Sequence, residues 1–150
     1  MHLSEHFTLG EVTKTSVKTA DGNIPSHVHI ENLKNLCENW LEDLRYSHNT
    51  LYGESADEPI IITSGYRSPE VNKAVGGSPT SNHLTGCAVD IRCIGIEQAI
   101  RYASILLDIS DGTKRDYDEL LIERNKQGRY WLHFAVRPKE NRRRTAFIQT

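Results

Sequence analysis

Residues 117–123 (YDELLIE) are followed, after the polar residues 125–128 (NKQG), by residues 130–136 (YWLHFAV). Both flanking segments are rich in aromatic and aliphatic side chains, and a short polar connection that contains glycine is typical of a hairpin. The sequence therefore predicts two adjacent antiparallel strands, and we expect them to close the core of the molecule.

The alternation of side chains along a strand predicts which residues of this hairpin share a face. The most economical register buries Leu120 and Ile122 against the apolar face of the second strand. The opposite face then carries His133 together with Glu119 and Glu123. A slip by one residue would surround the histidine with aliphatic side chains and bury the two acids, which is unfavourable.

Upstream of the hairpin, helical and strand-like patterns alternate. Apolar residues spaced by three and four positions predict amphipathic helices over residues 30–44 and 96–107. Short apolar runs predict buried strands over residues 59–64 and 87–91.

The remaining segments have the composition of a short helix, of loops and of an edge strand. Residues 68–75 predict a short helix, because a serine followed by a proline is a common helix start. We expect an irregular arm over residues 1–25, a loop over residues 45–58 and a last strand over residues 145–149. This order of elements predicts one α+β domain over residues 1–150, with helices packed on a small, mainly antiparallel sheet.

Composition excludes several classes of function. A chain of 150 residues with 37% hydrophobic and 25% charged residues is an ordinary globular domain, and its net charge of -2 argues against a nucleic-acid-binding protein. The basic run Arg142-Arg143-Arg144 is expected to be a solvated charge run, although attraction to an anionic polymer is an alternative.

The three cysteines form no paired motif, so we expect reduced thiols and synthesis in the cytoplasm. The first residues have no apolar core of a signal peptide, and no apolar run approaches the roughly 20 residues of a membrane span. We therefore expect no membrane partner. If the protein acts outside the cytoplasm, another factor has to release it.

His83 and Asp90 lie seven positions apart, separated mostly by small residues, and both are residue types that bind zinc. His133 is a possible third ligand from the hairpin. Two histidines and one aspartate would leave a coordination position open for water, which is the composition of a catalytic zinc site. The pattern favours metal-assisted hydrolysis with one zinc ion.

A zinc hydrolase also needs a carboxylate that accepts a proton and passes it to the leaving amine. Glu123, at the strand end beside the turn, is our first candidate for this general base, and Glu119 is the second. The alternative is that both glutamates are ordinary charges of an edge strand.

Arg67 lies between a predicted strand and a predicted helix, where it could bind a substrate carboxylate or a developing oxyanion. A structural salt bridge is the alternative. Ser81, two residues before His83, could contact substrate, orient a metal ligand or simply stabilise a turn. His27 and His29 are expected to be surface residues at a helix start.

Several of these motifs occur together and in order. They are SGYRSPEVN (residues 64–72), GG (76–77) and SNHLTGCAVDI (81–91), with FTLGE (7–11) and ENL (31–33) upstream and DELLIE (118–123) and WLH (131–133) downstream. In this combination the chain resembles the zinc D-Ala-D-Ala carboxypeptidase family of metallopeptidases, which includes peptidoglycan endopeptidases. It is most similar to the short, single-domain members found in phages and bacteria.

The resemblance implies the hedgehog-like fold of these peptidases, with zinc in a surface cleft. It implies His83, Asp90 and His133 as zinc ligands, Arg67 as the arginine that binds substrate or the oxyanion, and Ser81 beside the substrate. The chain departs from the pattern at two positions. Some relatives carry the acidic base three residues before the last histidine, where this chain has Tyr130, and a glutamine is more usual at position 119.

The sequence thus predicts a monomeric zinc metallopeptidase that cleaves the stem peptide of peptidoglycan, at a D-Ala-D-Ala or L-Ala-D-Glu type of bond. It would act on the cell wall as a phage endolysin after release from the cytoplasm, as a virion component, or as a cytoplasmic enzyme on soluble wall fragments. The alternative hypothesis is a non-catalytic module of the virion or the cell wall that keeps zinc for stability.

Overall fold

The computed structural model describes residues 1–53 and 57–150 of the chain. The helical elements are α1 (Leu9–Thr13), α2 (His27–Leu36), a π-helical turn (Cys37–Leu41), α3 (Glu42–Tyr52), α4 (Pro69–Ala74), a 3-10 helix (Asn82–Thr85) and α5 (Ile96–Thr113). The strands are β1 (Ile62–Ser64), β2 (Ala88–Cys93), β3 (Glu119–Arg124), β4 (Tyr130–Ala135) and β5 (Arg144–Gln149).

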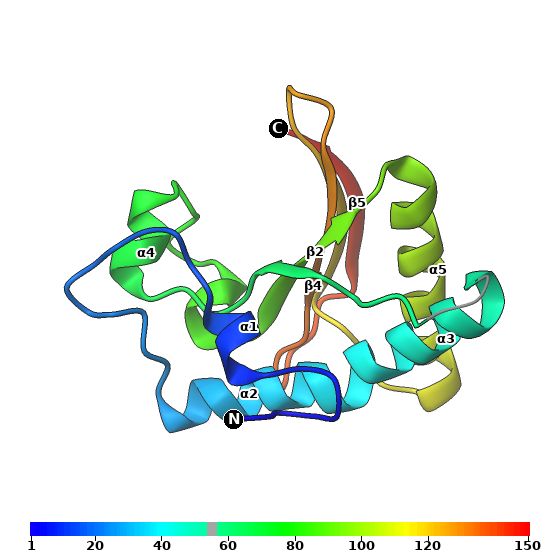
Figure 1. Cartoon of the computed structure of the whole chain (residues 1–150), viewed down its shortest axis with the longest axis horizontal. Helices are drawn as coiled ribbons and strands as arrows, with labels where there is room; N and C mark the ends of the chain where they lie inside the picture. Colours follow the sequence, from blue (N-terminus) through cyan, green and yellow to red (C-terminus); the bar gives the residue numbers. More distant parts are fainter. Residues whose placement is uncertain (54–56) are drawn as a thin grey trace.

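The strands form one sheet in the order β1-β2-β4-β3-β5. All neighbouring strands are antiparallel except β3 and β5, which are parallel. Figure 1 shows the sheet between α5 on one side and α4 on the other. The predicted α+β fold with a small, mainly antiparallel sheet is confirmed.

The hairpin register is the predicted one. Leu120 pairs with Phe134 and Ile122 with Leu132, so their side chains enter the core, whereas His133 lies opposite Leu121. Since Glu119 and Glu123 flank Leu121 at positions i±2, they share the face of His133.

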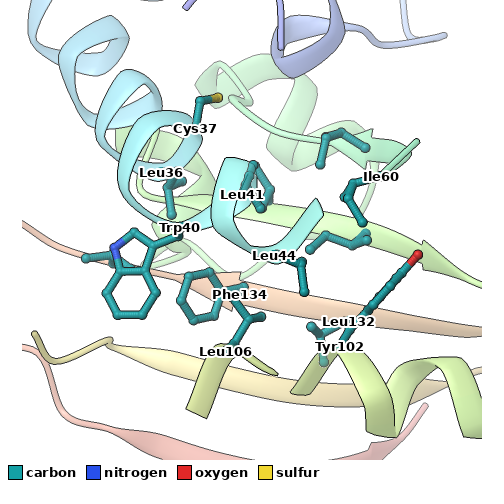
Figure 2. Packing of buried hydrophobic residues seen from close by; sticks show 14 of the residues in the cluster. Leu36, Cys37, Trp40, Leu41, Leu44, Ile60, Tyr102, Leu106, Leu132 and Phe134 are labelled. Carbon is teal, nitrogen blue, oxygen red and sulfur yellow. The ribbon is translucent and has the colours of Figure 1, made fainter. Parts of the chain in front are cut away.

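The hydrophobic core lies between the sheet and the helices α2, α3 and α5. Trp40 of the π-helical turn is 1% exposed, and its ring centroid lies 5.1 Å from that of Phe134 in β4. Figure 2 shows Leu41 and Leu44 in the same layer, above Leu132 and Phe134. Burial of this apolar face directs the other face of β2 and β4 away from the helices.

The prediction of a loop after the first long helix was wrong for its described residues. The helical segment that begins at His27 continues to Tyr52, and only a π-helical turn interrupts its α-helical pattern. The polar sequence after Leu44 hid this extension, because its inward-facing position is a histidine. His48 is 3% exposed and its ring lies edge-on to Tyr102 of α5, with centroids 4.9 Å apart. Residues 54–56 of the predicted loop lie outside the described residues.

The N-terminal arm is also more ordered than predicted, because it contains α1. Thr8 accepts a hydrogen bond from the backbone N–H of Glu11, whose side chain accepts one from the backbone N–H of Thr8. This reciprocal capping box is readable as Thr-x-x-Glu in the sequence, but the helix is too short to show an apolar periodicity.

The other predicted elements are present with shifted ends. Ser68 caps α4 and Pro69 occupies its first turn, as predicted. The predicted strand over residues 59–64 shortens to β1, and the last strand begins at Arg144. No helix of the described residues is long and apolar enough to cross a membrane.

The cysteines carry free thiols, as predicted. Cys37, Cys87 and Cys93 are all buried, and burial raises the pKa of Cys37 and of Cys93 to about 12. Thiols with such a high pKa are poor nucleophiles and poor metal ligands at neutral pH.

Gly65 allows α1 to approach the strand that leads to α4. A Cβ atom at this position would lie 2.1 Å from the carbonyl oxygen of Val12, which accepts a hydrogen bond from Tyr66 N–H. Because that oxygen belongs to the backbone, it cannot move aside without shifting α1.

We therefore expect Gly65→Ala to lower the free energy of unfolding by about 1–3 kcal/mol. Gly112→Ala is the matched control, because a Cβ there meets no atom within 4 Å and alanine is favoured over glycine in α5. That variant should be neutral or gain up to about 1 kcal/mol. Urea unfolding of the two variants measures the difference, and equal stabilities would contradict the close approach at Gly65.

Candidate metal centre

The sheet face turned away from the helical core brings the three predicted zinc ligands together. Asp90 of β2 and His133 of β4 are directly paired across the two strands, and His83 comes from the 3-10 helix that precedes β2. One potential ligand atom from each residue lies within 4.8 Å of the other two. Alternation places Asp90 between the core residues Val89 and Ile91, so its carboxylate points to the opposite face.

The ring of His83 is oriented by the backbone. Its Nδ1 lies 2.6 Å from the carbonyl oxygen of Gly65, which can only accept, so Nδ1 carries the proton. Its Nε2 is buried, 3.3 Å from Asp90 Oδ1, and has no hydrogen-bond partner within residues 1–53 and 57–150. Because Nδ1 is engaged by Gly65, Nε2 is the ring nitrogen that a metal ion beside Asp90 would meet, so this pair fits a metal ligand set.

His133 is held on both sides by carboxylates. Its Nδ1 lies 3.1 Å from Asp90 Oδ1, and its Nε2 lies 2.9 Å from Glu119 Oε1. Although burial lowers the pKa of His133, the hydrogen bonds to Asp90 and Glu119 outweigh it and raise the pKa to about 9. The two carboxylates therefore favour positive charge on or beside the His133 ring. A metal would take the Nδ1 side, and Nε2–H would keep Glu119 as its acceptor.

The position of Glu119 argues against its role as a general base, our second candidate for that role. It lies on the far side of the His133 ring from Asp90 and also accepts hydrogen bonds from Asn82 Nδ2 at 2.8 Å and Arg144 at 3.3 Å. The hydrogen bond with His133 lowers the pKa of Glu119 to about 2. Such a carboxylate is a weak proton acceptor, but it suits the orientation of a metal-ligating histidine.

The same contacts give a physical account of glutamate, instead of glutamine, at this position. His133, Asn82 and Arg144 all present N–H groups, and a carboxylate accepts from all three. A glutamine amide would turn one of its own N–H groups toward a donor.

Glu123 lines the same cleft and is held differently. Its Oε2 accepts a hydrogen bond of 2.9 Å from the indole N–H of Trp131, its neighbour across the hairpin. Burial, followed by the nearby charge of Asp90, raises the pKa of Glu123. A carboxyl group with a raised pKa is better suited to accept and return a proton at neutral pH than Glu119 is.

Arg67 forms the wall of the site on the α4 side. Its NH2 lies 3.8 Å from Asp90 Oδ2, and its NH1 donates to Asn72 Oδ1 at 3.0 Å. Its Nε is buried and has no hydrogen-bond partner within the described residues. Gly77 leaves room for this arrangement, because a Cβ there would lie 2.0 Å from Asn72 Oδ1.

Ser81 is the N-cap of the 3-10 helix that carries His83. Its Oγ accepts a hydrogen bond of 3.1 Å from the backbone N–H of His83. This contact fits the predicted role of orienting a metal ligand and of stabilising a turn, and the hydroxyl proton remains able to contact a substrate in the cleft.

The cleft has a volume of about 580 Å³. Its wall contains the predicted ligands, both glutamates, Arg67 and Ser81. This volume lies within the range of roughly 300–1,000 Å³ that is usual for small-ligand sites. The structure thus collects every predicted functional side chain at one surface.

Sequence reasoning missed Asn82 and underestimated the arginines near the C-terminus. Asn82 Nδ2 donates to Asp118 at 2.7 Å as well as to Glu119, and its Oδ1 accepts from Arg137 at 2.9 Å. Arg142 forms hydrogen bonds with Asp118 of 2.8 and 3.0 Å, so the basic run is more than a solvated face. In the sequence, Asn82 is marked only by its position directly before His83 in the segment of residues 81–91.

His27 and His29 do not join the candidate metal centre. His27 is exposed, and His29 stacks on Tyr66 with ring centroids 5.2 Å apart. This agrees with their predicted place at a helix start.

We expect the wild-type protein to bind one zinc ion and His133→Ala to lose it, because two remaining ligands hold zinc poorly. Glu119→Ala should retain the ion with an affinity weakened about 10–100-fold, since the orientation of His133 is lost. Metal analysis after dialysis and competition with a chromogenic chelator measure both effects.

His27→Ala serves as the matched histidine control and should bind zinc as the wild type does. An unchanged stoichiometry in His133→Ala would remove His133 from the ligand set. An unchanged affinity in Glu119→Ala would remove the orienting role of Glu119.

Asp118 generates a prediction on the pH dependence of stability. Burial alone would raise its pKa, but hydrogen bonds from Arg142 and Asn82 lower it to about 2. Because this value lies below the unfolded value of about 3.9, ionised Asp118 stabilises the fold by about 2 kcal/mol above pH 4. That contribution should disappear as the pH falls from about 4 to about 2.

Urea unfolding between pH 6 and pH 2.5 tests this expectation. Asp118→Asn should be less stable than the wild type at pH 6, and the gap should narrow with acidification. Asp108→Asn, an exposed substitution in α5, should run parallel to the wild type. A gap that stays constant with pH would contradict the role of the Asp118 charge.

Comparison with known proteins agrees with this geometry. A model of the family described as peptidase M15 matches residues 5–112, well over half of the 150 residues. The match contains Arg67, Ser81, His83 and Asp90 and ends before β3, so the places of Glu123 and His133 come from the structure. No curated protein matches the chain. M15 enzymes are metallopeptidases that typically use zinc, and the α+β fold and the His-Asp-His cluster are consistent with them. The chain belongs to the peptidase M15 family.

Proposed function

We propose that this protein is a zinc peptidase that hydrolyses a peptide bond in the stem peptide of peptidoglycan, of the D-Ala-D-Ala carboxypeptidase or the L-Ala-D-Glu endopeptidase type. The observation that carries the proposal is the buried Nε2 of His83, which has no hydrogen-bond partner among the described residues and lies in one cluster of potential metal ligands with Asp90 and His133. Membership in a peptidase family and the presence of Glu123 and Arg67 in the same cleft support the reaction type.

The ligand set would be His83 Nε2, Asp90 and His133 Nδ1. The chemistry that zinc supplies at such a site is polarisation of the scissile carbonyl and activation of water at neutral pH. The protein contributes orientation, because Gly65 and Glu119 hold the two imidazole rings through their second nitrogens.

Glu123 is our proposed general base. Its carboxylate takes the proton from the attacking water and returns it to the nitrogen of the leaving amine, so the proton count balances over the cycle. Trp131 holds one carboxylate oxygen and thereby positions the other. Arg67, with its buried guanidinium beside Asp90, would stabilise the oxyanion or hold a substrate carboxylate.

The physiological setting is part of the proposal. The protein would meet peptidoglycan as a monomer, after release from the cytoplasm in the manner of a phage endolysin or as a component of a virion. Neither a nucleic acid nor a membrane is required as a partner.

Mass spectrometry of peptidoglycan fragments after incubation with the zinc-loaded protein tests the proposal and identifies the bond. New amino groups should appear with zinc and be absent when a chelator is added. If zinc raises the stability of the protein but no bond is cleaved, the chain is a non-catalytic zinc-stabilised module instead.

Glu123→Gln should bind zinc normally and lose turnover by a factor of about 10²–10⁴, because it removes the proton acceptor and leaves the ligands in place. Glu97→Gln, on the exposed face of α5, is the matched control and should retain activity. The rate of peptide cleavage at saturating substrate is the measurement. Normal turnover in Glu123→Gln would exclude it as the base.

A further inference from the structure

The connection between β4 and β5 supplies three arginines to the cleft of the candidate metal centre. Arg137 follows β4, Arg142 precedes β5, and Arg144 is the first residue of β5. All three line the same hollow of about 580 Å³ as the candidate metal ligands. Arg142 and Arg144 belong to the basic run of the sequence, to which the proposed peptidase reaction gives no role.

Two carboxylates hold these arginines in place. Arg142 donates to Asp118 through Nε at 3.0 Å and through NH2 at 2.8 Å, and this two-point contact fixes the plane of its guanidinium group. Arg137 Nε lies 3.2 Å from the same carboxylate, and Arg144 NH1 donates to Glu119 at 3.3 Å. The side chain of Asp118 is 0% exposed, so water does not compete for its contacts.

The backbone of the connection is fixed as well. Asn141 accepts from the backbone N–H of Arg137 at 2.8 Å and donates through Nδ2 to the carbonyl oxygen of the same residue at 3.0 Å. The backbone N–H of Arg142 donates to the Asp118 carboxylate at 3.0 Å. Arg143 has a φ of 54°, a left-handed conformation that arginine rarely adopts unless the surrounding contacts hold it. The arginines are therefore oriented before any ligand binds.

Each arginine of the cleft keeps N–H groups that no described residue accepts. Arg137 contacts acceptors through Nε, Arg142 through Nε and NH2, and Arg144 through NH1. The side chains are 31%, 51% and 52% exposed, respectively. The remaining nitrogens of the three guanidinium groups are thus available as donors to a ligand in the cleft.

The balance of charge at this end of the cleft favours an anion. The three arginines carry one positive charge more than Asp118 and Glu119, the two carboxylates that hold them. A divalent cation at the neighbouring metal centre would add further positive charge. Ser78 and Thr80 contribute hydroxyl groups to the same wall.

A phosphate group fits these donors better than a carboxylate does. A carboxylate has two oxygens in one plane and is matched by a single guanidinium group, as Asp118 is by Arg142. The oxygens of a phosphate group point in several directions, so it can accept from separate guanidinium groups at the same time. Arg142 and Arg144 are held through different carboxylates and present such separate donors.

We propose that Arg137, Arg142 and Arg144 form a binding site for a phosphate group at the Glu119 end of the cleft. The ligand is inorganic phosphate or a phosphodiester of an anionic polymer, since the two share this chemistry. The site goes beyond the proposed peptidase function, because none of these arginines is a candidate metal ligand or base. It would allow the protein to hold a phosphate-bearing ligand beside the peptide.

The first experiment is an NMR titration of the zinc-loaded protein with inorganic phosphate, followed through the Nε–H signals of the arginines. One phosphate should bind, and Arg144→Gln should weaken the affinity about tenfold or more, because charge-assisted hydrogen bonds are lost. Arg137→Gln repeats the test at the other end of the connection. Circular dichroism and zinc content identify variants that are folded.

Arg129→Gln is the matched control, because Arg129 is exposed in the β3–β4 hairpin and forms no ion pair within residues 1–53 and 57–150. It should bind phosphate as the wild type does. Phosphate that is bound by zinc alone would keep its affinity in Arg144→Gln and Arg137→Gln, and that result would overturn the site.

The second experiment compares phosphate with acetate at the same ionic strength. Acetate should bind the wild-type protein about tenfold more weakly or less, because it engages fewer guanidinium groups. Arg144→Lys keeps the charge but loses the planar fork, so it should recover only part of the phosphate affinity. Equal affinities for acetate and phosphate would contradict the assignment to a phosphate group.

The third experiment identifies the source of the phosphate. An oligomer of glycerol phosphate is the probe, because the phosphodiester is its only charged group. Binding at least about tenfold tighter than that of inorganic phosphate, and weakened by added salt, would assign the site to a polymer. Equal or weaker binding would assign it to free phosphate. If the folded wild-type protein binds neither probe, the inference is wrong, whether or not the protein cleaves peptides.

Discussion

The pairing of Asp90 with His133 across β2 and β4 is the constraint on which the rest of the structure depends. Each residue lies between two side chains that are buried in the core, so the hydrophobic packing of one sheet face sets the position of the polar groups on the other. A slip of one residue in either strand would bury a charge and expose an aliphatic side chain. The strand register that buries the core is therefore also the register that sets the geometry of the candidate metal centre.

The polar face is kept intact by complementary hydrogen bonds. Buried carboxylates and imidazoles are costly unless each is paired, and here the contacts form a chain from Arg144 through Glu119 to His133 and Asp90. Nε2 of His83, which lies 3.3 Å from Asp90 Oδ1, has no hydrogen-bond partner among the described residues. A buried polar atom without a partner beside this chain of contacts is where a metal ion would be satisfied as well.

Two carboxylates on one strand acquire different properties from their surroundings. Hydrogen bonds with His133 and Asn82 lower the pKa of Glu119, whereas burial and the nearby charge of Asp90 raise the pKa of Glu123. Strand alternation could place both beside His133, but it could not separate an orienting residue from a base. That distinction depends on which side of the His133 ring each carboxylate meets and on Asn82, which is distant from β3 in sequence and contacts it only in the folded chain.

The sequence by itself determined the elements whose signals are local. Strand alternation and the hairpin turn predict the register of β3 and β4 and the face that holds Glu119, Glu123 and His133. The Ser68-Pro69 pair predicts the start of α4. The extension of α3 through His48 escaped prediction, because its burial depends on contact with α5. Only the tertiary structure decided which nitrogen of each histidine faces Asp90 in the candidate metal centre and that a second hollow shares Arg67 with the cleft. The physical reason is that these properties arise from contacts through space between segments far apart in the chain.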